Sequence, residues 1–220
     1  MIVTLIPAKK YSSRLTGKNR RILGNKPLFE HTIDFVVKSN FLKNCYISSD
    51  DKKILNRAQK LGCGIIERPK KLAKEKSSME DVIFHSIKHL EKKKIKFKSI
   101  ILLQPTSPFR PRGILKKMIS IYLKNKKTVV TVKKTNNKFL KSILSFNKEN
   151  KVLSKKYFNS NTQALPKLYM PNGSIYIFDK KNFLKNKVIP LNRLDIYETK
   201  KHYNIDIDDL SDLTLAKQYV

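Results

Sequence analysis

Four stretches of the chain carry side chains that could bind and transform a charged small molecule. The first follows an apolar run at residues 2–7 and reads AKKYSSRLTGKN, with cations at Lys9, Arg14 and Lys18. It lacks the spacing of a G-x-x-x-x-G-K-S/T loop, and without several glycines the backbone cannot wrap phosphates tightly, so charge must come from side chains. The stretch predicts an anion-binding loop, with a solvated lysine-rich turn as the alternative.

An acidic stretch, NIDIDDLSDL, lies near the end of the sequence. Asp206 and Asp208 flank Ile207, so in an extended chain both carboxylates project from one side. Two such carboxylates can share a hard cation such as Mg²⁺, which phosphoryl or nucleotidyl transfer requires. Taken alone, the pair could instead cap the helix that comes after it, where Asp209 and Asp212 are also placed to act as caps.

The remaining two stretches are LLQPTSPFR and PNGSIYIF. In the first, two prolines bracket Thr106 and Ser107 and fix a turn, which holds Gln104 at a strand end with its amide free for a polar ligand. In the second, Asn172 and Gly173 form a turn signal ahead of an apolar run. Either feature could be purely structural.

The order of expected elements indicates how these stretches could meet. Strand-like and helix-like patterns alternate through the first two thirds of the chain, which predicts βα units and a mainly parallel sheet. We expect strands at 2–7, 44–49, 63–69, 99–105, 128–132, 172–178 and 188–191, and helices at 27–40, 52–62, 77–92, 114–123, 179–185 and 208–220. Ligands of open α/β sheets collect at the carboxyl ends of strands, so the loops at 8–19, 67–78 and 104–112 should line one site.

Length and composition limit the class of protein. The 220 residues suit a single α/β domain over 1–220, and a Lys- and Asn-rich stretch at about 134–166 predicts an irregular, hairpin-containing insertion. No apolar run reaches the length of a membrane span, and we read no signal peptide at the N-terminus. We therefore expect a cytoplasmic protein without a membrane partner.

The formal net charge of +31 invites a nucleic-acid interpretation. However, Lys outnumbers Arg five to one and is scattered over every segment, whereas specific readers of phosphate and guanine favour Arg. We expect no specific nucleic-acid partner. Cys45 and Cys63 lack C-x-x-C spacing and are expected to be core thiols, and His85 and His89 lack an H-E-x-x-H pattern, so neither pair predicts a metal site.

Taken in order, the pieces IPA, S-x-RL-x-GKN, ISSDD, ERP, LLQPTSPFR, PNGSIYIF and DID resemble the acylneuraminate cytidylyltransferases. These enzymes make CMP-sialic acid and CMP-activated relatives such as legionaminic and pseudaminic acid. The resemblance runs from Ile6 to Asp208. It implies a Rossmann-like, three-layer α/β nucleotidyltransferase fold with a mainly parallel sheet and a small dimerisation insertion. Kdo cytidylyltransferases share a similar first loop, whereas LLQPTSPFR and PNGSIYIF look more like the sialate branch.

The resemblance also implies roles for individual residues. Lys18 and Asn19 match the family's KN pair, which lies on the triphosphate and near the nucleotide, and Asp206 and Asp208 match its magnesium-binding D-I-D. Lys18 and the two aspartates are the expected catalytic groups. The residues expected to bind nucleotide are Lys9, Ser12, Lys18, Asn19, Arg68 and Ser78, and those expected to bind the sugar are Gln104 and Lys141.

The activity that the resemblance implies is that of an enzyme that joins CMP from CTP to a nine-carbon 2-keto-3-deoxy sugar acid and releases pyrophosphate, with Mg²⁺ as cofactor. A homodimer is expected, in which the insertion of one subunit covers the site of the other. A Kdo-type sugar nucleotidyltransferase and a non-catalytic nucleotide- or nucleic-acid-binding relative are the alternatives.

The sequence departs from the family pattern at several positions. In the first loop, Lys9 replaces an arginine, Tyr11 a glycine and Ser13 a lysine. Thr16 replaces a proline, and Thr162 replaces an arginine aimed at the sugar or phosphate. A side chain at position 11 could crowd the phosphate path, because glycine there lets the backbone approach closely.

Overall fold

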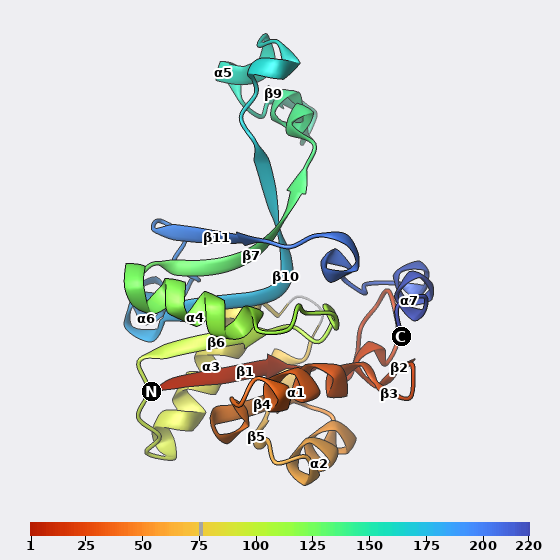
Figure 1. The fold of residues 1–220 in the computed structure, drawn as a ribbon, viewed down its shortest axis with the longest axis vertical. Coiled ribbons are helices and arrows are strands. Elements are labelled where there is room, and N and C mark those ends of the chain that lie inside the picture. The colour runs from red at the N-terminus through yellow and green to blue at the C-terminus, as the bar shows by residue number, and fades with distance from the viewer. Residues whose placement is uncertain (75–76) are drawn as a thin grey trace.

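A seven-stranded sheet forms the centre of the computed structural model, which describes residues 1–74 and 77–220 (Figure 1). In sheet order its strands are β11 (Leu194–Glu198), β7 (Thr128–Thr135), β10 (Leu168–Asp179), β6 (Ser99–Leu103), β1 (Ile2–Pro7), β4 (Cys45–Ser49) and β5 (Gly64–Glu67). All neighbours pair in parallel except β10, which runs antiparallel to β6 and β7. The predicted mainly parallel sheet is confirmed.

Helices cover both faces of this sheet and give three layers (Figure 1). One face packs on α1 (Leu28–Lys38), α2 (Lys52–Lys60) and α4 (Ile114–Asn125), and the other on α3 (Met79–Lys92) and α6 (Lys180–Asn186). The continuous apolar run of β6 is explained by this position, because its five residues are buried between the two layers. The Rossmann-like α/β class expected from the sequence is confirmed.

A third, smaller core joins the two ends of the chain. Leu15 of the first loop and Ile207 of the acidic stretch are both buried in it, beside Leu213 and Ala216 of α7 (Leu210–Lys217). A short hairpin of β2 (Ile22–Leu23) and β3 (Lys26–Pro27) contributes Leu23. These contacts place the cationic loop against the aspartates, which lie about 190 residues away in sequence.

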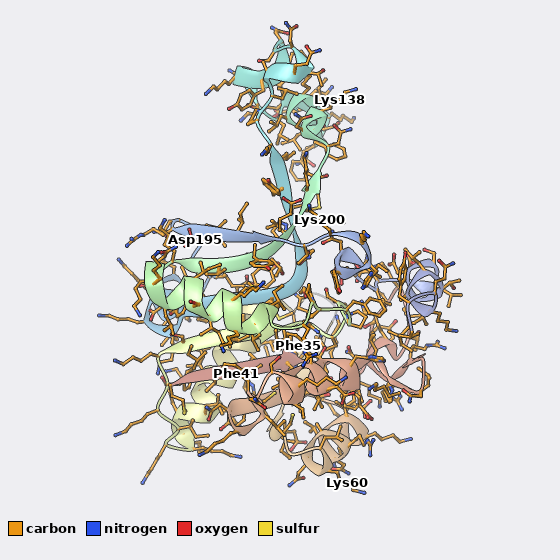
Figure 2. All side chains as sticks on the ribbon, viewed as in Figure 1. Phe35, Phe41, Lys60, Lys138, Asp195 and Lys200 are labelled. Atoms are coloured by element: carbon orange, nitrogen blue, oxygen red, sulfur yellow. The ribbon has the colours of Figure 1, made fainter. Side chains whose placement is uncertain are left out.

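The stretch at 134–166 forms an arm that projects from the body of the molecule (Figures 1 and 2). The arm begins where β7 and β10 continue their pairing at Thr135 and Leu168. Beyond that point it contains a hairpin of β8 (Ile143–Phe146) and β9 (Glu149–Val152) and the short helix α5 (Lys155–Phe158). The hairpin expected in this stretch is present, and its role as a dimerisation insertion stays a prediction.

Two expectations about the later strands are wrong. Asn172 and Gly173 do not form a turn before a strand; they lie inside β10, at a shift in its register with β7. Both residues have other roles in this strand. Gly173 adopts a φ of +75°, which favours glycine, and Asn172 Nδ2 donates hydrogen bonds to Thr199 Oγ1 and Asn204 Oδ1.

The strand expected at 188–191 is also absent, and β11 at Leu194–Glu198 takes its place. The apolar letters VIPL belong to the connection after α6, where the Pro190 carbonyl accepts a hydrogen bond from Thr128 Oγ1. Pro190 has no backbone N–H to donate to a neighbouring strand. Residues 194–198, LDIYE, pair along their whole length with β7.

The other predicted elements are present, with boundaries that differ by a few residues. Asp51 and Ser78 cap α2 and α3, and Asp209 and Asp212, which the sequence also placed as caps, form a capping box on α7. Cys45 and Cys63 are buried free thiols with their sulfur atoms 3.7 Å apart. No helix among the described residues is long and apolar enough to cross a membrane, and a cytoplasmic location stays a prediction.

Candidate active site

A cleft of about 370 Å³ opens where β1, β5 and β6 end. Its walls come from the loop after β1, the segment between β5 and α3, the turn after β6 and the acidic stretch before α7. Residues 75 and 76 of the predicted loop 67–78 lie outside the described part of the chain. With the exception of Lys141, every predicted site residue lines this cleft: Lys9, Ser12, Lys18, Asn19, Arg68, Ser78, Gln104, Asp206 and Asp208.

The first loop is held in shape by its own side chains. Asn19 donates from Nδ2 to the Lys9 carbonyl at 2.8 Å, and Gly17, with φ +65°, turns the chain into a short 3-10 helix at Lys18–Arg20. Lys18 and Asn19 are buried, so the packing around them fixes the positions of their side chains at the cleft wall. Tyr11 is half exposed and is not part of the cleft wall, so its side chain does not crowd the cleft.

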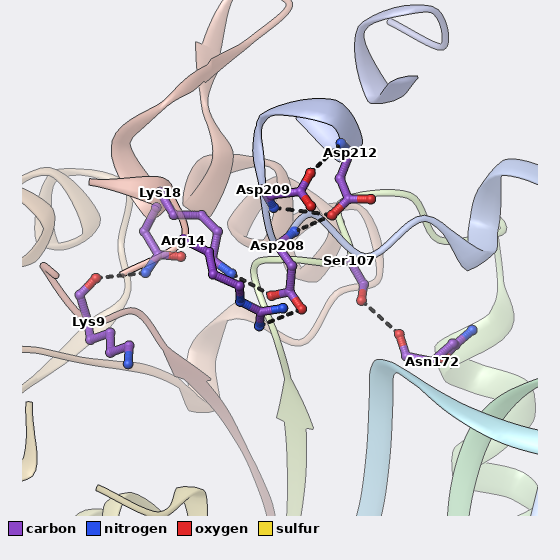
Figure 3. Close-up of polar contacts among 9 residues, drawn as sticks. Lys9, Arg14, Lys18, Ser107, Asn172, Asp208, Asp209 and Asp212 are labelled. Atoms are coloured by element: carbon purple, nitrogen blue, oxygen red, sulfur yellow. Dashed lines mark hydrogen bonds and ion pairs between the residues drawn. The ribbon is translucent and has the colours of Figure 1, made fainter. Parts of the chain in front are cut away.

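Two cations of this loop meet one carboxylate of the acidic stretch (Figure 3). Lys18 Nζ lies 2.8 Å from Asp208 Oδ1, and Arg14 Nη2 lies 2.8 Å from Asp208 Oδ2. Partial burial alone would raise the pKa of Asp208, but the hydrogen bond and charge of Lys18, with help from Arg14, hold that pKa below its ordinary value. Asp208 is therefore a carboxylate at neutral pH.

Asp206 sits in a different environment. Burial raises the pKa of the Asp206 carboxyl above its ordinary value, and the nearby Asp208 charge adds to this, while Thr106 and Lys18 oppose it. Its Oδ1 is buried and has no hydrogen-bond partner within the described residues. A buried carboxylate oxygen without a partner is costly, and a bound cation would compensate for it.

The backbone of the acidic stretch is fixed by the start of α7. Asp212 Oδ2 accepts hydrogen bonds from the amides of Asp208 and Asp209, and Asp209 Oδ1 accepts from the amide of Asp212 (Figure 3). The capping box thus uses Asp209 and Asp212, and leaves Asp206 and Asp208 free to face the cleft. Capping, the alternative interpretation of the pair at 206 and 208, is not what the structure shows.

These residues fit a hard divalent cation. Two carboxylates, one with an unpartnered oxygen, are the donor set that Mg²⁺ uses when substrate phosphates and water complete its coordination. Over residues 1–74 and 77–220 no group of three or more His, Cys, Asp or Glu side chains could hold a metal by itself. Asp206 and Asp208 would hold the ion together with a bound triphosphate.

Gln104 is placed by a buried frame behind the cleft. The Arg110 guanidinium donates to the carbonyls of Gln104 at 2.8 Å and Ser174 at 3.1 Å, and burial lowers its pKa to about 9. Ser107 Oγ donates to the Asn172 carbonyl (Figure 3). A Cβ at Gly173 would lie 3.4 Å from Asp206 Oδ2 and 3.7 Å from Gln104 Oε1, so the bare glycine lets β10 approach the site closely.

Arg68 and Ser78 belong to the part of the wall between β5 and α3. Arg68 is buried and donates from Nη2 to the Ser48 carbonyl at 2.9 Å, and burial lowers its pKa to about 10. The Ser78 hydroxyl oxygen accepts from the Asp81 amide as the cap of α3, which leaves its proton available to a ligand. Both side chains are therefore fixed by the scaffold.

The structure does not bring Lys141 to the cleft of its own chain. It ends a 3-10 turn, Asn137–Lys141, on the arm, where Figure 2 labels Lys138. Conversely, Lys74 lines the cleft and was not singled out from the sequence. Its place in the loop after the third strand was the available signal, but it was indistinguishable from the many other lysines.

Fold and site together define an α/β protein whose cleft brings a cationic loop against two aspartates. The chain belongs to the cytidylyltransferase family, whose model matches residues 3–219. The N-acylneuraminate cytidylyltransferase of Escherichia coli is 30% identical over 98% of this chain and 51% of its own length. The CMP-N,N'-diacetyllegionaminic acid synthase of Legionella pneumophila is 32% identical over 84% of this chain and 81% of its own.

The chain is also similar to another curated enzyme and to a solved structure. The pseudaminic acid cytidylyltransferase of Campylobacter jejuni is 26% identical over 97% of this chain and 93% of its own. The structure of a CMP:2-keto-3-deoxy-manno-octonic acid synthetase complexed with CTP has the same fold, with a TM-score of 0.72 at 14% identity over 99% of this chain and 97% of that one. Relatives thus differ in length, and the chain spans about half of the Escherichia coli one.

Proposed function

We propose that this protein transfers CMP from CTP to a nonulosonic acid of the sialic, legionaminic or pseudaminic type and releases pyrophosphate. The observation that carries the proposal is the convergence of Lys18 with Asp206 and Asp208 in one cleft at the ends of β1 and β6. The names of the Escherichia coli, Legionella and Campylobacter relatives support the choice of CTP and of this class of acceptor.

Different residues of the cleft bind different parts of the substrate, according to their chemistry. Lys9 and Lys18 bind the triphosphate, and Ser12, Asn19, Arg68 and Ser78 hold the nucleoside. Asp206 and Asp208 would hold Mg²⁺, which supplies charge neutralisation at the phosphate oxygens and steadies the leaving pyrophosphate when bound. The protein's own contribution is to position the nucleotide and the acceptor, and to present fixed charges where negative charge develops.

The acceptor site is proposed to continue from Gln104 along the sheet. Gln104 and Met79 line the nucleotide cleft and also an adjacent groove of about 590 Å³ over β7, β10 and β11. That groove is largely apolar, with lining residues that include Val130, Val132, Tyr169, Pro171, Tyr176 and Ile196. Such a surface suits the methyl groups of N-acyl substituents, which Kdo lacks, so it favours a nonulosonic acid over Kdo.

A pyrophosphate-release assay with CTP, Mg²⁺ and a panel of sugar acids tests this proposal. We expect turnover with at least one of N-acetylneuraminic, N,N'-diacetyllegionaminic and pseudaminic acid, and much less with Kdo. Turnover with Kdo alone would move the protein to the Kdo-type alternative. Absence of any CTP-dependent reaction, together with tight and steeply salt-dependent RNA binding, would support the non-catalytic alternative instead.

We also propose that two copies of the chain form the working enzyme. The arm carries exposed apolar side chains, among them Phe139, Ile143 and Phe146, which is 77% exposed. It also carries Lys141, which the resemblance assigns to the sugar acid and which is outside its own cleft. If the arm of each copy lies over the site of the other, both observations have one explanation.

Sedimentation equilibrium tests the dimer. We expect the mass of two chains for the wild type and a shift towards one chain for Phe146→Asp, because a charge at a buried apolar contact is unfavourable. Asn147→Asp, at the adjacent tip of the hairpin between β8 and β9, changes the charge by the same single unit and is the matched control. A wild-type protein with the mass of a single chain at micromolar concentration would contradict the proposal.

A further inference from the structure

Arg14 is one of the cations of the first loop, but the resemblance assigns it no role of its own. The family pattern has a lysine at position 13, where this chain has Ser13, and Ser13 is exposed and outside the cleft wall. The next residue, Arg14, does line the cleft. This chain therefore brings a cation into the cleft from the neighbouring position.

The contacts of Arg14 differ in kind from those of Lys18. Both bind Asp208 at 2.8 Å, but the Lys18 side chain is 11% exposed and the Arg14 side chain is 67% exposed. The Lys18 side chain is therefore held by the residues packed around it. The Arg14 side chain contacts Asp208 directly but is otherwise surrounded by solvent. A solvent-exposed ion pair contributes little to stability, so Arg14 can leave Asp208 at small cost.

We propose that Arg14 is a shared cation of this site: it neutralises Asp208 in the nucleotide-free protein and transfers to the triphosphate when CTP binds. The inference rests on the proposed function, because it requires a triphosphate in the cleft. An Arg fork matches phosphate oxygens in two-point geometry, so the triphosphate competes well with a single carboxylate oxygen. Transfer of Arg14 frees Asp208 Oδ2 at the moment when a divalent cation arrives with the nucleotide.

This assignment predicts opposite effects of one substitution on two ligands. Arg14→Ala should weaken binding of CTP in EDTA about tenfold, because a charge-assisted contact to the triphosphate is lost. The same variant should bind Mn²⁺ more tightly in the absence of nucleotide, by up to about fivefold, because a cation that competes for Asp208 has gone. Calorimetry with CTP and electron paramagnetic resonance of free Mn²⁺ measure the two affinities.

Two further variants keep the test specific. Arg14→Lys retains the charge but not the fork, so both effects should be smaller than in Arg14→Ala. Arg112→Ala removes an exposed arginine that does not line the cleft and should leave both affinities unchanged. A role of Arg14 in merely holding the loop predicts that both ligands bind less well to Arg14→Ala, and that result, or no change in either affinity, overturns the proposal. Failure of the wild type to bind CTP would overturn the proposed function as well, which separates the two.

Discussion

Replacing Lys18 with alanine should lower kcat/KM for CTP about 10²–10³-fold, as expected for the loss of one fixed charge at a transition state that develops negative charge. Lys18 is the buried cation of the first loop, and the 3-10 helix at Lys18–Arg20 fixes its backbone. Because it is positioned before the substrate binds, it needs no reorganisation when the bond to pyrophosphate breaks. Pyrophosphate release at varied CTP concentration measures the effect.

The matched control is Lys10→Ala in the same loop. Lys10 is exposed and lies outside the cleft wall, and its contact to Asp50 uses the backbone amide, which alanine keeps. We expect wild-type turnover from this variant. The melting temperature of Lys18→Ala should stay close to wild type, since Arg14 still pairs with Asp208. Normal turnover in a folded Lys18→Ala protein would show that the cleft has been assigned to the wrong chemistry.

Local signals were sufficient for most of the fold. Apolar runs and helical patterns located the parallel strands and their helices, because the central strands are buried between two layers and each helix buries one face. The strand at 194–198 was missed because it lies at the sheet edge, where Leu194 and Ile196 are 42% and 44% exposed and polar residues alternate with them. The run VIPL at 188–191 is more continuously apolar and so gave the stronger strand signal, but it contains Pro190 and lies in the loop between α6 and β11.

The candidate site was also predictable in part. The rule that ligands bind at the carboxyl ends of parallel strands predicted which loops line the site. Residues of these loops and of the acidic stretch line one cleft. The long-range contacts were not predictable from patterns alone. Leu15 and Ile207 share a small core, and Gly173 approaches Asp206, because of packing between segments distant in sequence. The pairing of Arg14 with Asp208 likewise depends on which way the loop turns.

Asp206→Asn should abolish most turnover and at the same time stabilise the protein free of nucleotide. Burial raises the pKa of Asp206, and its Oδ1 lacks a hydrogen-bond partner within the described residues, so the folded state carries an unfavourable charge at neutral pH. The amide of similar shape removes the charge, and a gain of about 1 kcal/mol from this corresponds to a rise of about 2–4 °C in melting temperature. Loss of a carboxylate ligand should lower kcat about 10²–10³-fold.

The pH dependence of the stability gain identifies its cause. Since the pKa of Asp206 is higher in the folded state than its ordinary value of 3.8, the folded state holds the proton more tightly, and wild-type stability falls as pH rises through this range. The advantage of Asp206→Asn should therefore be absent at pH below the unfolded pKa, grow as pH rises and level off above the folded pKa. Urea denaturation across this range measures it.

Asp195→Asn is the control with the same change of atoms at a carboxylate outside the cleft. Asp195 accepts a hydrogen bond from Asn125 and pairs with Lys127 at 3.6 Å, so its charge is already compensated. This variant should gain no stability and keep full turnover. If Asp206→Asn were destabilised at neutral pH, the carboxylate would be contributing to the fold through its neighbours Thr106 and Lys18, and the view that Asp206 is kept for a bound cation at the expense of stability would be wrong.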